Sequence, residues 1–276
     1  MGLELKRCAL TENSLQFTFA ERAEVDINNP SQLQSALSSR EYGLVINCAA
    51  YTQVDQAEEN QSLALETNGT SVGILAALCQ RNNAHLLHIS TDYVFDGMST
   101  VPYFEEAIPA PVNVYGRSKL LGEQLIIGKC HYTIIRTSWI CSSFGSNFVK
   151  SMLRAGRSND SLNVVADQVG SPTSTEDLGG LLMLIAQRLK GMSWPGGIYH
   201  YSSKGQTNWC DFARFIMAEA NIACEVNPIT TAEFGAVAQR PLYSKLSTNK
   251  IVQTLGITIA DWQTSVGRII KELEAE

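Results

Sequence analysis

The chain has 276 residues, of which 45% are hydrophobic and 17% charged, and its formal net charge is −6. These values are typical of a globular protein and exclude a disordered or fibrous one. The acidic balance disfavours a nucleic-acid partner, which would need a clustered basic face. The longest apolar run, 181–186, is too short to cross a bilayer. With no signal-peptide pattern and seven cysteines without a C-x-x-C pair, we expect a cytoplasmic protein.

Short apolar runs alternate with helical patterns through the first half of the chain. A weak strand at 16–19 precedes a helix at 30–37, for which Asn29 is the expected N-cap and Pro30 the first helical residue. The further predicted strands and helices are strand 43–50, helix 62–81, strand 85–90, helix 114–127, strand 133–140 and helix 147–154. This alternation predicts an α/β fold with a doubly wound, Rossmann-like parallel sheet.

After about residue 158 the elements become shorter and are interrupted by prolines. We therefore expect one domain at 1–158 and a smaller C-terminal region at 159–276. The predicted helix at 175–190 is expected to pack back on the first domain.

The most informative spacing is that of Tyr115 and Lys119. Four residues apart on a helix, the two side chains lie on one face. A lysine ammonium beside a phenol favours the phenolate, so we expect a lowered pKa for Tyr115 and a role in proton transfer. Taken alone, the spacing also fits a surface lysine beside a half-buried tyrosine.

A polar segment, Ser90 to Asp92, directly follows the predicted buried strand. Ligands of open α/β sheets bind beyond the carboxyl ends of the strands, so Thr91 and Asp92 are placed to face one. By itself the segment also fits a helix cap or a polar turn. Together with Tyr115 and Lys119, it indicates a site that holds a carbonyl group.

Other candidate residues favour structural roles. His85 and His88 are three apart on a strand and point to opposite faces, so they do not share a metal, and no metal site is expected. The carboxylates of Asp55, Glu58 and Glu59 suit the start of a helix. Arg240 fits either a pyrophosphate site or a surface salt bridge.

Several segments in order resemble a known family. Residues 90–97 (STDYVFDG) and 114–119 (VYGRSK) are similar to the extended short-chain dehydrogenase/reductase superfamily and, within it, to the dTDP-4-dehydrorhamnose reductase family. Further matching segments lie at 47–58, 136–139, 147–148, 167–173, 240–241 and 261–262. The resemblance runs from Gly2 to near the C-terminus.

The resemblance implies a role for each matching residue. Tyr115 would give a proton to the 4-keto oxygen, Lys119 would activate Tyr115 and hold the nicotinamide ribose, and Thr91 would hydrogen-bond the keto oxygen. Asp92, Trp139 and Arg240 would contact the substrate, with Trp139 against the deoxysugar. The residues implied along the cofactor are Gly2, Asp26, Ile27, Ala49, Ala50, Tyr51 and Ile89.

The implied reaction is reduction of a dTDP-activated 4-keto-6-deoxyhexose by NADPH or NADH. Residues 1–158 would then bind the dinucleotide and 159–276 mainly the substrate. Family members often pair as homodimers, and the sequence leaves the oligomeric state open. Residues 20–22 offer both an acid and an arginine, so they leave the choice between NADH and NADPH open, and a magnesium requirement is not readable. Related dehydratases carry an acid after the Thr-Asp pair, where this chain has Tyr93, which disfavours elimination.

The chain departs from the family at its start. Gly2 matches the last glycine of the family's glycine-rich turn, and no strand with earlier glycines precedes it. We therefore expect unpaired neighbouring strands and weak cofactor affinity. Two alternatives to the reductase stay open: a non-catalytic regulatory subunit resembling that of methionine adenosyltransferase, and an inactive shortened relative.

Overall fold

The computed structural model describes residues 1–191 and 194–275, and the chain divides into two compact units. Unit 1 comprises residues 1–96, 108–136 and 179–199. Unit 2 comprises residues 97–107 and 137–178 and the chain from 200 onward. Both units are discontinuous, so the division does not follow the predicted boundary at residue 158. None of the helices in the described ranges has the length and hydropathy that a membrane crossing requires.

Unit 1 is built on a four-stranded parallel sheet with the strand order β1-β2-β3-β8. Strands β1 and β2 pair in parallel, with Leu44 opposite His85 and Asn47 opposite His88. The elements of the unit are α1 (Gly2–Ala9), α2 (Pro30–Ser38), β1 (Leu44–Asn47), α3 (Val54–Glu59), α4 (Gln61–Leu65), a π-helical turn (Glu66–Thr70), α5 (Ser71–Arg81), β2 (His85–Thr91), a 3-10 turn (Asp92–Val94), α6 (Val114–Ile126), β3 (Tyr132–Thr137), β8 (Gly197–His200) and, from residue 179, α8 (Thr175–Lys190). The predicted α/β fold is confirmed.

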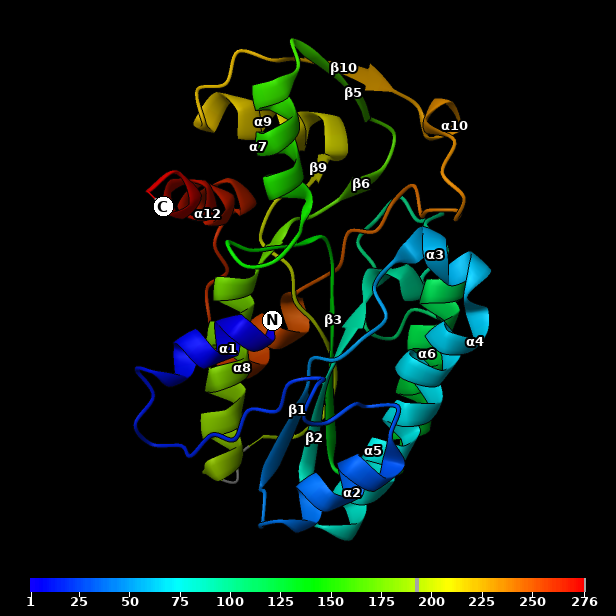
Figure 1. Ribbon diagram of the computed structural model, residues 1–276, viewed down its shortest axis with the longest axis vertical. Coiled ribbons are helices and arrows are strands. Elements are labelled where there is room, and N and C mark those ends of the chain that lie inside the picture. Colours follow the sequence, from blue (N-terminus) through cyan, green and yellow to red (C-terminus); the bar gives the residue numbers. More distant parts are fainter. Residues whose placement is uncertain (192–193, 276) are drawn as a thin grey trace. The chain divides into compact units, whose positions relative to one another are not determined.

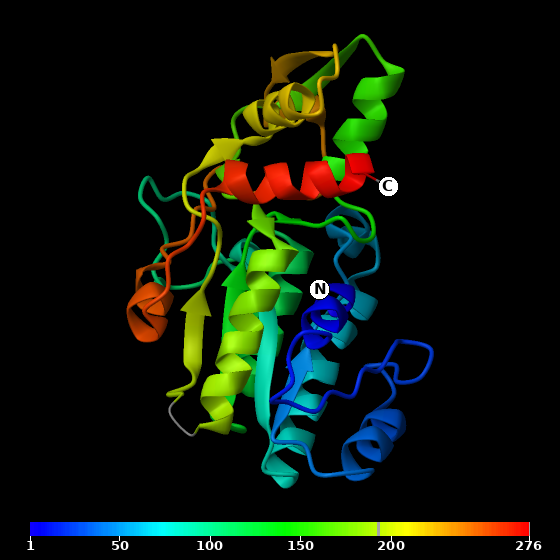
Figure 2. The same ribbon diagram turned by 90° about the vertical axis from the view of Figure 1, so that its left-hand side faces the viewer.

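Helices cover both faces of this sheet. Helices α4, α5 and α6 lie on one face, and the unit-1 part of α8 lies on the other with α1 (Figures 1 and 2). The core beneath α2 and α5 is fully apolar and includes Leu33, Val72, Leu86 and Ile134. The long apolar runs of the sequence are therefore strands and helices buried against one another.

The predicted strand at 16–19 does not form. These residues carry no strand hydrogen bonds, and β1 is an edge strand that pairs with β2 alone in the described ranges. A strand is stabilised by a hydrogen-bonding neighbour, and residues 16–19 lack one in this sheet. The unpaired edge of β1 is the one that the sequence led us to expect.

The predicted helix at 62–81 forms over its whole range, with a local change of hydrogen-bond pattern inside it. A π-helical turn at Glu66–Thr70 separates α4 from α5. The predicted strand at 133–140 ends early, at Thr137. Trp139 has φ +46°, a left-handed conformation that no regular strand contains.

Unit 2 contains short strands and four helices of seven residues or more that lie wholly within it. Strands β5 and β10 pair in parallel, and an apolar core joins Val149, Phe212, Ile216 and Val266. The elements of the unit are β4 (Ile140–Cys141), α7 (Phe148–Ser158), β5 (Ser161–Val165), β6 (Val169–Gly170), β7 (Thr173–Ser174), β9 (Thr207–Asn208), α9 (Trp209–Glu219), β10 (Glu225–Ile229), α10 (Thr231–Phe234), α11 (Asn249–Leu255) and α12 (Trp262–Ala275).

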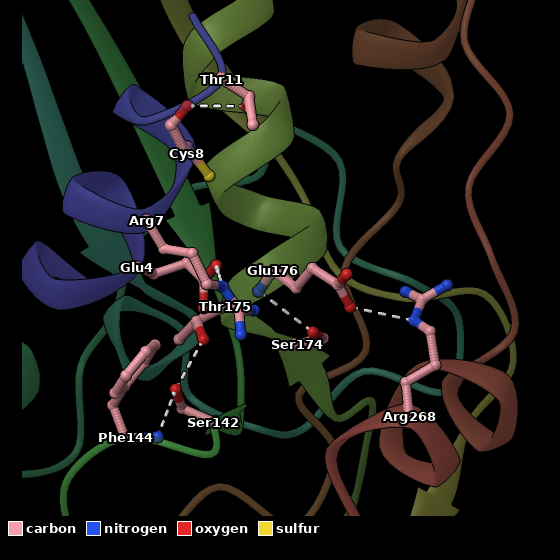
Figure 3. A network of polar contacts seen from close by, with 10 residues as sticks. All are labelled: Glu4, Arg7, Cys8, Thr11, Ser142, Phe144, Ser174, Thr175, Glu176 and Arg268. Carbon is pink, nitrogen blue, oxygen red and sulfur yellow. Dashed lines mark hydrogen bonds and ion pairs between the residues drawn. The ribbon is translucent and has the colours of Figure 1, made fainter. Parts of the chain in front are cut away.

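Polar contacts fix helix ends within each unit (Figure 3). In unit 1 the buried carboxylate of Glu4 accepts hydrogen bonds from Arg7 one turn later on α1. In unit 2 the first turn of α8 is capped by Ser174, which accepts from the N–H of Glu176 at 3.1 Å. Arg268 of α12 forms an ion pair with Glu176 at 3.0 Å.

A buried ion pair joins α6 to the sheet. Arg136 on β3 forms two parallel hydrogen bonds with Glu123 on α6, through Nη2 at 2.7 Å and Nε at 3.0 Å. The Ser90 hydroxyl of β2 donates to the same carboxylate at 2.5 Å. The Arg136 and Glu123 side chains are 3% and 1% exposed. A bidentate pair of this kind fixes both distance and orientation, so it sets the position of α6 against β2 and β3.

Replacing Arg136 with Met should destabilise the protein by about 3–5 kcal/mol, because a buried carboxylate then loses its partner. Urea unfolding followed by circular dichroism measures the change. The matched control is Lys271→Met, which removes a lysine that is 78% exposed in a 3.8 Å ion pair with Glu219. Its cost should stay below about 1 kcal/mol. Equal costs for the two variants would contradict a central role of the buried pair.

Candidate active site

The Tyr115–Lys119 segment lies in the first turns of α6. Asn113 caps this helix by accepting from the N–H of Gly116 at 2.7 Å, and Glu58 of α3 accepts from the N–H of Val114 at 2.8 Å. Glu58 is thus a positioning carboxylate, as the sequence suggested, but it lies with Glu59 at the end of α3 and not at its start. A Cβ at Gly116 would collide with the carbonyl oxygen of Tyr93 and would meet Pro111 at 2.9 Å. The helix start is therefore held tightly from several sides.

Thr91 and Tyr115 form the centre of the site. Thr91 is the last residue of β2, and its hydroxyl donates to Oδ1 of Asp92 at 3.0 Å. Its side chain also acts on the pKa of the Tyr115 phenol. Burial raises the pKa of Tyr115 to about 12, while Thr91 lowers it and the charge of Asp92 raises it. The expected lowering of this pKa is thus wrong for the structure. Desolvation outweighs the other influences on the phenol.

Lys119 lies at the same end of β2, one turn along α6 from Tyr115. Its ammonium donates to the carbonyl oxygen of Ile89 at 2.7 Å, and the side chain is 2% exposed. Burial lowers the pKa of Lys119 to about 8, against the opposing effect of Glu123. At neutral pH the Lys119 side chain is therefore still mostly an ammonium. This ammonium lies at the carboxyl end of β2.

A second contact of Lys119 leads to β1. Its Nζ lies 3.2 Å from Nε2 of His88, and Nδ1 of His88 lies 3.1 Å from Nδ2 of Asn47. His85, the other histidine of this strand, instead contacts the Thr133 hydroxyl at 2.8 Å. The two histidines therefore have separate partners, as their spacing predicted.

A groove of about 610 Å³ runs along the unpaired edge of β1. Three of the implied cofactor residues, Gly2, Ile27 and Ala49, line it together with Asn47 and Cys48. The volume lies within the range of about 300–1,000 Å³ typical of small-molecule sites. Asp26, Ala50, Tyr51 and Ile89 are not among its lining residues.

The groove fits the nucleotide part of a dinucleotide in two respects. It is mostly apolar at β1 and α2, where a base and ribose can be buried. Gly2, the first residue of α1, lines one end, and the N–H groups in the first turn of a helix have no acceptor within the helix. A helix N-terminus attracts phosphate. Weak cofactor affinity stays a prediction.

The two remaining candidates belong to unit 2. Trp139 stacks on Trp209 with ring centroids 3.6 Å apart, and Gly170 packs against its indole. Arg240 donates to the carbonyl oxygen of Ala238 at 3.2 Å. Among the described residues, no group of three His, Cys, Asp or Glu side chains could hold a metal ion.

Comparisons with known proteins identify the family. The model of the RmlD substrate binding domain family matches residues 1–275. The chain belongs to this family. A dTDP-4-dehydrorhamnose reductase of Aggregatibacter actinomycetemcomitans is 40% identical, covering 98% of this chain and 94% of the relative. The spore coat polysaccharide biosynthesis protein SpsK of Bacillus subtilis is 37% identical, covering 99% of this chain and 94% of its own.

Solved structures agree with this family membership. A dTDP-4-dehydrorhamnose reductase from Bacillus anthracis, in complex with NADP, has a TM-score of 0.90 at 38% identity and covers 97% of this chain and 94% of its own. One from Clostridium acetobutylicum has a TM-score of 0.93 at 35% identity and covers 99% and 95%. The resemblance that the sequence motifs carried is therefore confirmed.

The sequence motifs did not single out Asn68 as a site residue. In the π-helical turn, its amide accepts from the N–H of Tyr51 at 2.8 Å and donates to the Tyr51 carbonyl and the Ser118 hydroxyl, both at 2.9 Å. It thus ties the segment after β1 to the helix that carries Lys119. π-Helical turns recur at functional sites. The hydrophobic pattern of residues 62–81 does not indicate a π-helical turn, so the sequence gave no signal for it.

Replacing Gly116 with Ala should destabilise unit 1 by about 1–3 kcal/mol, because the added methyl group forces α6 away from Tyr93. Thermal or urea unfolding measures this. The matched control is Gly180→Ala in α8, an exposed helical glycine whose added Cβ meets nothing within 4 Å. That change should be neutral or stabilise by up to about 1 kcal/mol. A neutral Gly116→Ala would show that the helix start is not tightly packed.

Proposed function

We propose that this chain reduces the 4-keto group of dTDP-4-dehydro-L-rhamnose with NADPH. The product is dTDP-L-rhamnose, used for cell-surface polysaccharide. The observation that carries the proposal is the grouping of Thr91, at the end of β2, with Tyr115 and Lys119 on α6, where burial shifts the pKa of both α6 side chains. The reductase names of the most similar relatives support the same reaction.

Each residue of this group has a distinct task. Tyr115 keeps its proton at neutral pH because burial raises its pKa to about 12, so it acts as the proton donor to the 4-keto oxygen. Thr91, whose hydroxyl donates to Oδ1 of Asp92 in the structure, would turn that hydrogen to the same keto oxygen when substrate is bound. The Lys119 ammonium stabilises the phenolate that remains after the transfer.

When bound, NADPH supplies the hydride to the carbonyl carbon. Gly2 at the start of α1 would hold phosphate, Ile27 would pack at the adenine and Ala49 would border the cofactor backbone, with Asp26, Ala50, Tyr51 and Ile89 nearby. Lys119 would bind the nicotinamide ribose. NADPH is preferred over NADH because Arg22 offers a cation beside Asp26, at 3.6 Å, and because the relative from Bacillus anthracis is in complex with NADP.

The substrate class follows from the residues that match the family's substrate positions. Tyr93, which follows Thr91 and Asp92, carries no carboxyl group to expel water, which favours reduction over elimination. The family resemblance assigns Asp92 to the sugar, Trp139 to the deoxysugar and Arg240 to the pyrophosphate, and the Trp139 ring already stacks on Trp209 in the structure. We place this activity in the cytoplasm, where nucleotide sugars and NADPH are both available. We expect the active protein to be a homodimer.

Tyr115→Phe should reduce kcat by about 10²–10⁴-fold, because it removes the proton donor and leaves the ring in place. The assay follows NADPH absorbance at 340 nm with dTDP-4-dehydro-L-rhamnose. Tyr132→Phe at the start of β3 is the matched control and should retain full activity. A wild-type protein that binds the dTDP-sugar but consumes no NADPH would favour the regulatory-subunit alternative.

The rate should fall as pH rises above about 8. Because burial lowers the pKa of Lys119 to about 8, the ammonium is present below that pH and is lost above it. A profile of kcat/KM against pH, which reports groups of the free enzyme, measures this limb. A rate that stays constant from pH 7 to 10 would show that the charge of Lys119 is not required.

A further inference from the structure

A buried chain of polar side chains links β1, β2 and α6. Asn47 ends β1, His88 lies on β2 and Lys119 on α6. The Asn47 amide is 3.1 Å from His88, and the far ring nitrogen of His88 is 3.2 Å from Nζ of Lys119. All three residues are 5% exposed or less, so their hydrogen bonds do not exchange freely with water.

The orientation of the Asn47 amide is fixed by the backbone. The N–H of Ala49 donates to Oδ1 of Asn47 at 3.0 Å, so the NH₂ group of Asn47 faces Nδ1 of His88. An amide NH₂ group donates and cannot accept. Nδ1 must therefore be the accepting nitrogen of the imidazole.

The imidazole of His88 is neutral. It is fully buried, and burial, together with the nearby charge of Lys119, holds its pKa well below the ordinary range. A neutral imidazole with an accepting Nδ1 carries its proton on Nε2. That N–H bond points at the amino group of Lys119.

This tautomer opposes a charge on Lys119. An ammonium has three donors and no acceptor, whereas a neutral amine accepts the Nε2–H hydrogen bond and still donates to the Ile89 carbonyl. To favour the ammonium, His88 would have to move its proton to Nδ1, and the Asn47 amide would have to turn away from Ala49. The proton on Lys119 is thus coupled to the backbone beside Ala49.

The other ionisable groups near Lys119 do not oppose its charge through a tautomer, as His88 does. On its own helix, Glu123 favours the ammonium, and Tyr115 lies one turn before. After β1, Cys48 is a neutral thiol because burial raises its pKa to about 11. His88 on β2 is the neighbour whose tautomer can change without any change of net charge.

We propose that His88 and Asn47 are positioning residues that set the proton affinity of Lys119 through the His88 tautomer. The inference rests on the proposed function only for the catalytic importance of Lys119. Since Asn47 and Ala49 both line the groove, a ligand that displaces the Ala49 N–H would release the amide and favour the ammonium. Occupation of the groove and protonation of Lys119 would then be coupled.

The direct test reads the tautomer by two-bond ¹H–¹⁵N correlation NMR on the whole protein. The chain has four histidines, so the spectrum of a His88→Gln variant assigns the His88 signal. We expect the Nε2–H tautomer in the wild type at a pH above about 8, where Lys119 is a neutral amine that accepts this bond. In Asn47→Asp, both carboxylate oxygens accept, so the proton should move to Nδ1. An Nδ1–H wild type, or the same tautomer in both proteins, would overturn the proposal.

The second test is the alkaline limb of kcat/KM. Asn47→Asp and His88→Gln each give Lys119 an acceptor, so the limb should move up by about one pH unit, a tenfold gain in proton affinity. His85→Gln, the same change on the same strand, should leave the limb in place. Asn47→Asp also adds a charge, and the double variant with His88→Gln controls for it. In the His88→Gln background, Asn47→Asp should move the alkaline limb by less than it does in the wild type.

The two tests separate the possible failures. An equal alkaline limb in wild type, His88→Gln and Asn47→Asp would overturn the inference even if the enzyme is active. A protein that consumes no NADPH would instead refute the proposed function, and the NMR tautomer would still decide the inference. If His88→Gln does not fold, the comparison of wild type with Asn47→Asp remains.

Discussion

The geometry of unit 1 depends on the buried ion pair between Glu123 and Arg136. It fastens α6 to β3, and through Ser90 it fastens the same helix to β2. Tyr115 and Lys119 are carried by α6 and Thr91 by β2, so the pair fixes the distance between the donor helix and the strand that presents the hydroxyl. A buried bidentate pair serves this purpose because its energy depends steeply on geometry.

Burial makes the geometry of the ion pair important for its energy, and it also shifts the pKa values of the site residues. Burial keeps Tyr115 protonated and brings the pKa of Lys119 to about 8, so a proton donor and a nearby cation coexist at neutral pH. The neutral His88 and the amide of Asn47 adjust this balance without adding charge. A carbonyl reductase needs this combination, because the proton must leave the phenol as negative charge develops on the substrate oxygen.

Much of the fold follows from local sequence. The helix predicted at 175–190 is observed at the same residues, and Asn29 caps α2 as its position before Pro30 indicates. The strand at 16–19 was wrong, because a strand requires a hydrogen-bonding neighbour. The helix at 62–81 forms over its whole range, but its π-helical turn at Glu66–Thr70 was not predicted. Local patterns contain neither kind of information.

The sequence by itself determined the family, the α/β architecture and the shared face of Tyr115 and Lys119, since apolar periodicity, capping residues and four-residue spacing act over a single element. The tertiary structure decided the direction of the Tyr115 pKa shift and the partners of Lys119. It also decided that His88 faces Lys119 while His85 faces Thr133. These features depend on burial and on contacts between residues distant in the chain, which arise only when the strands and helices have packed together.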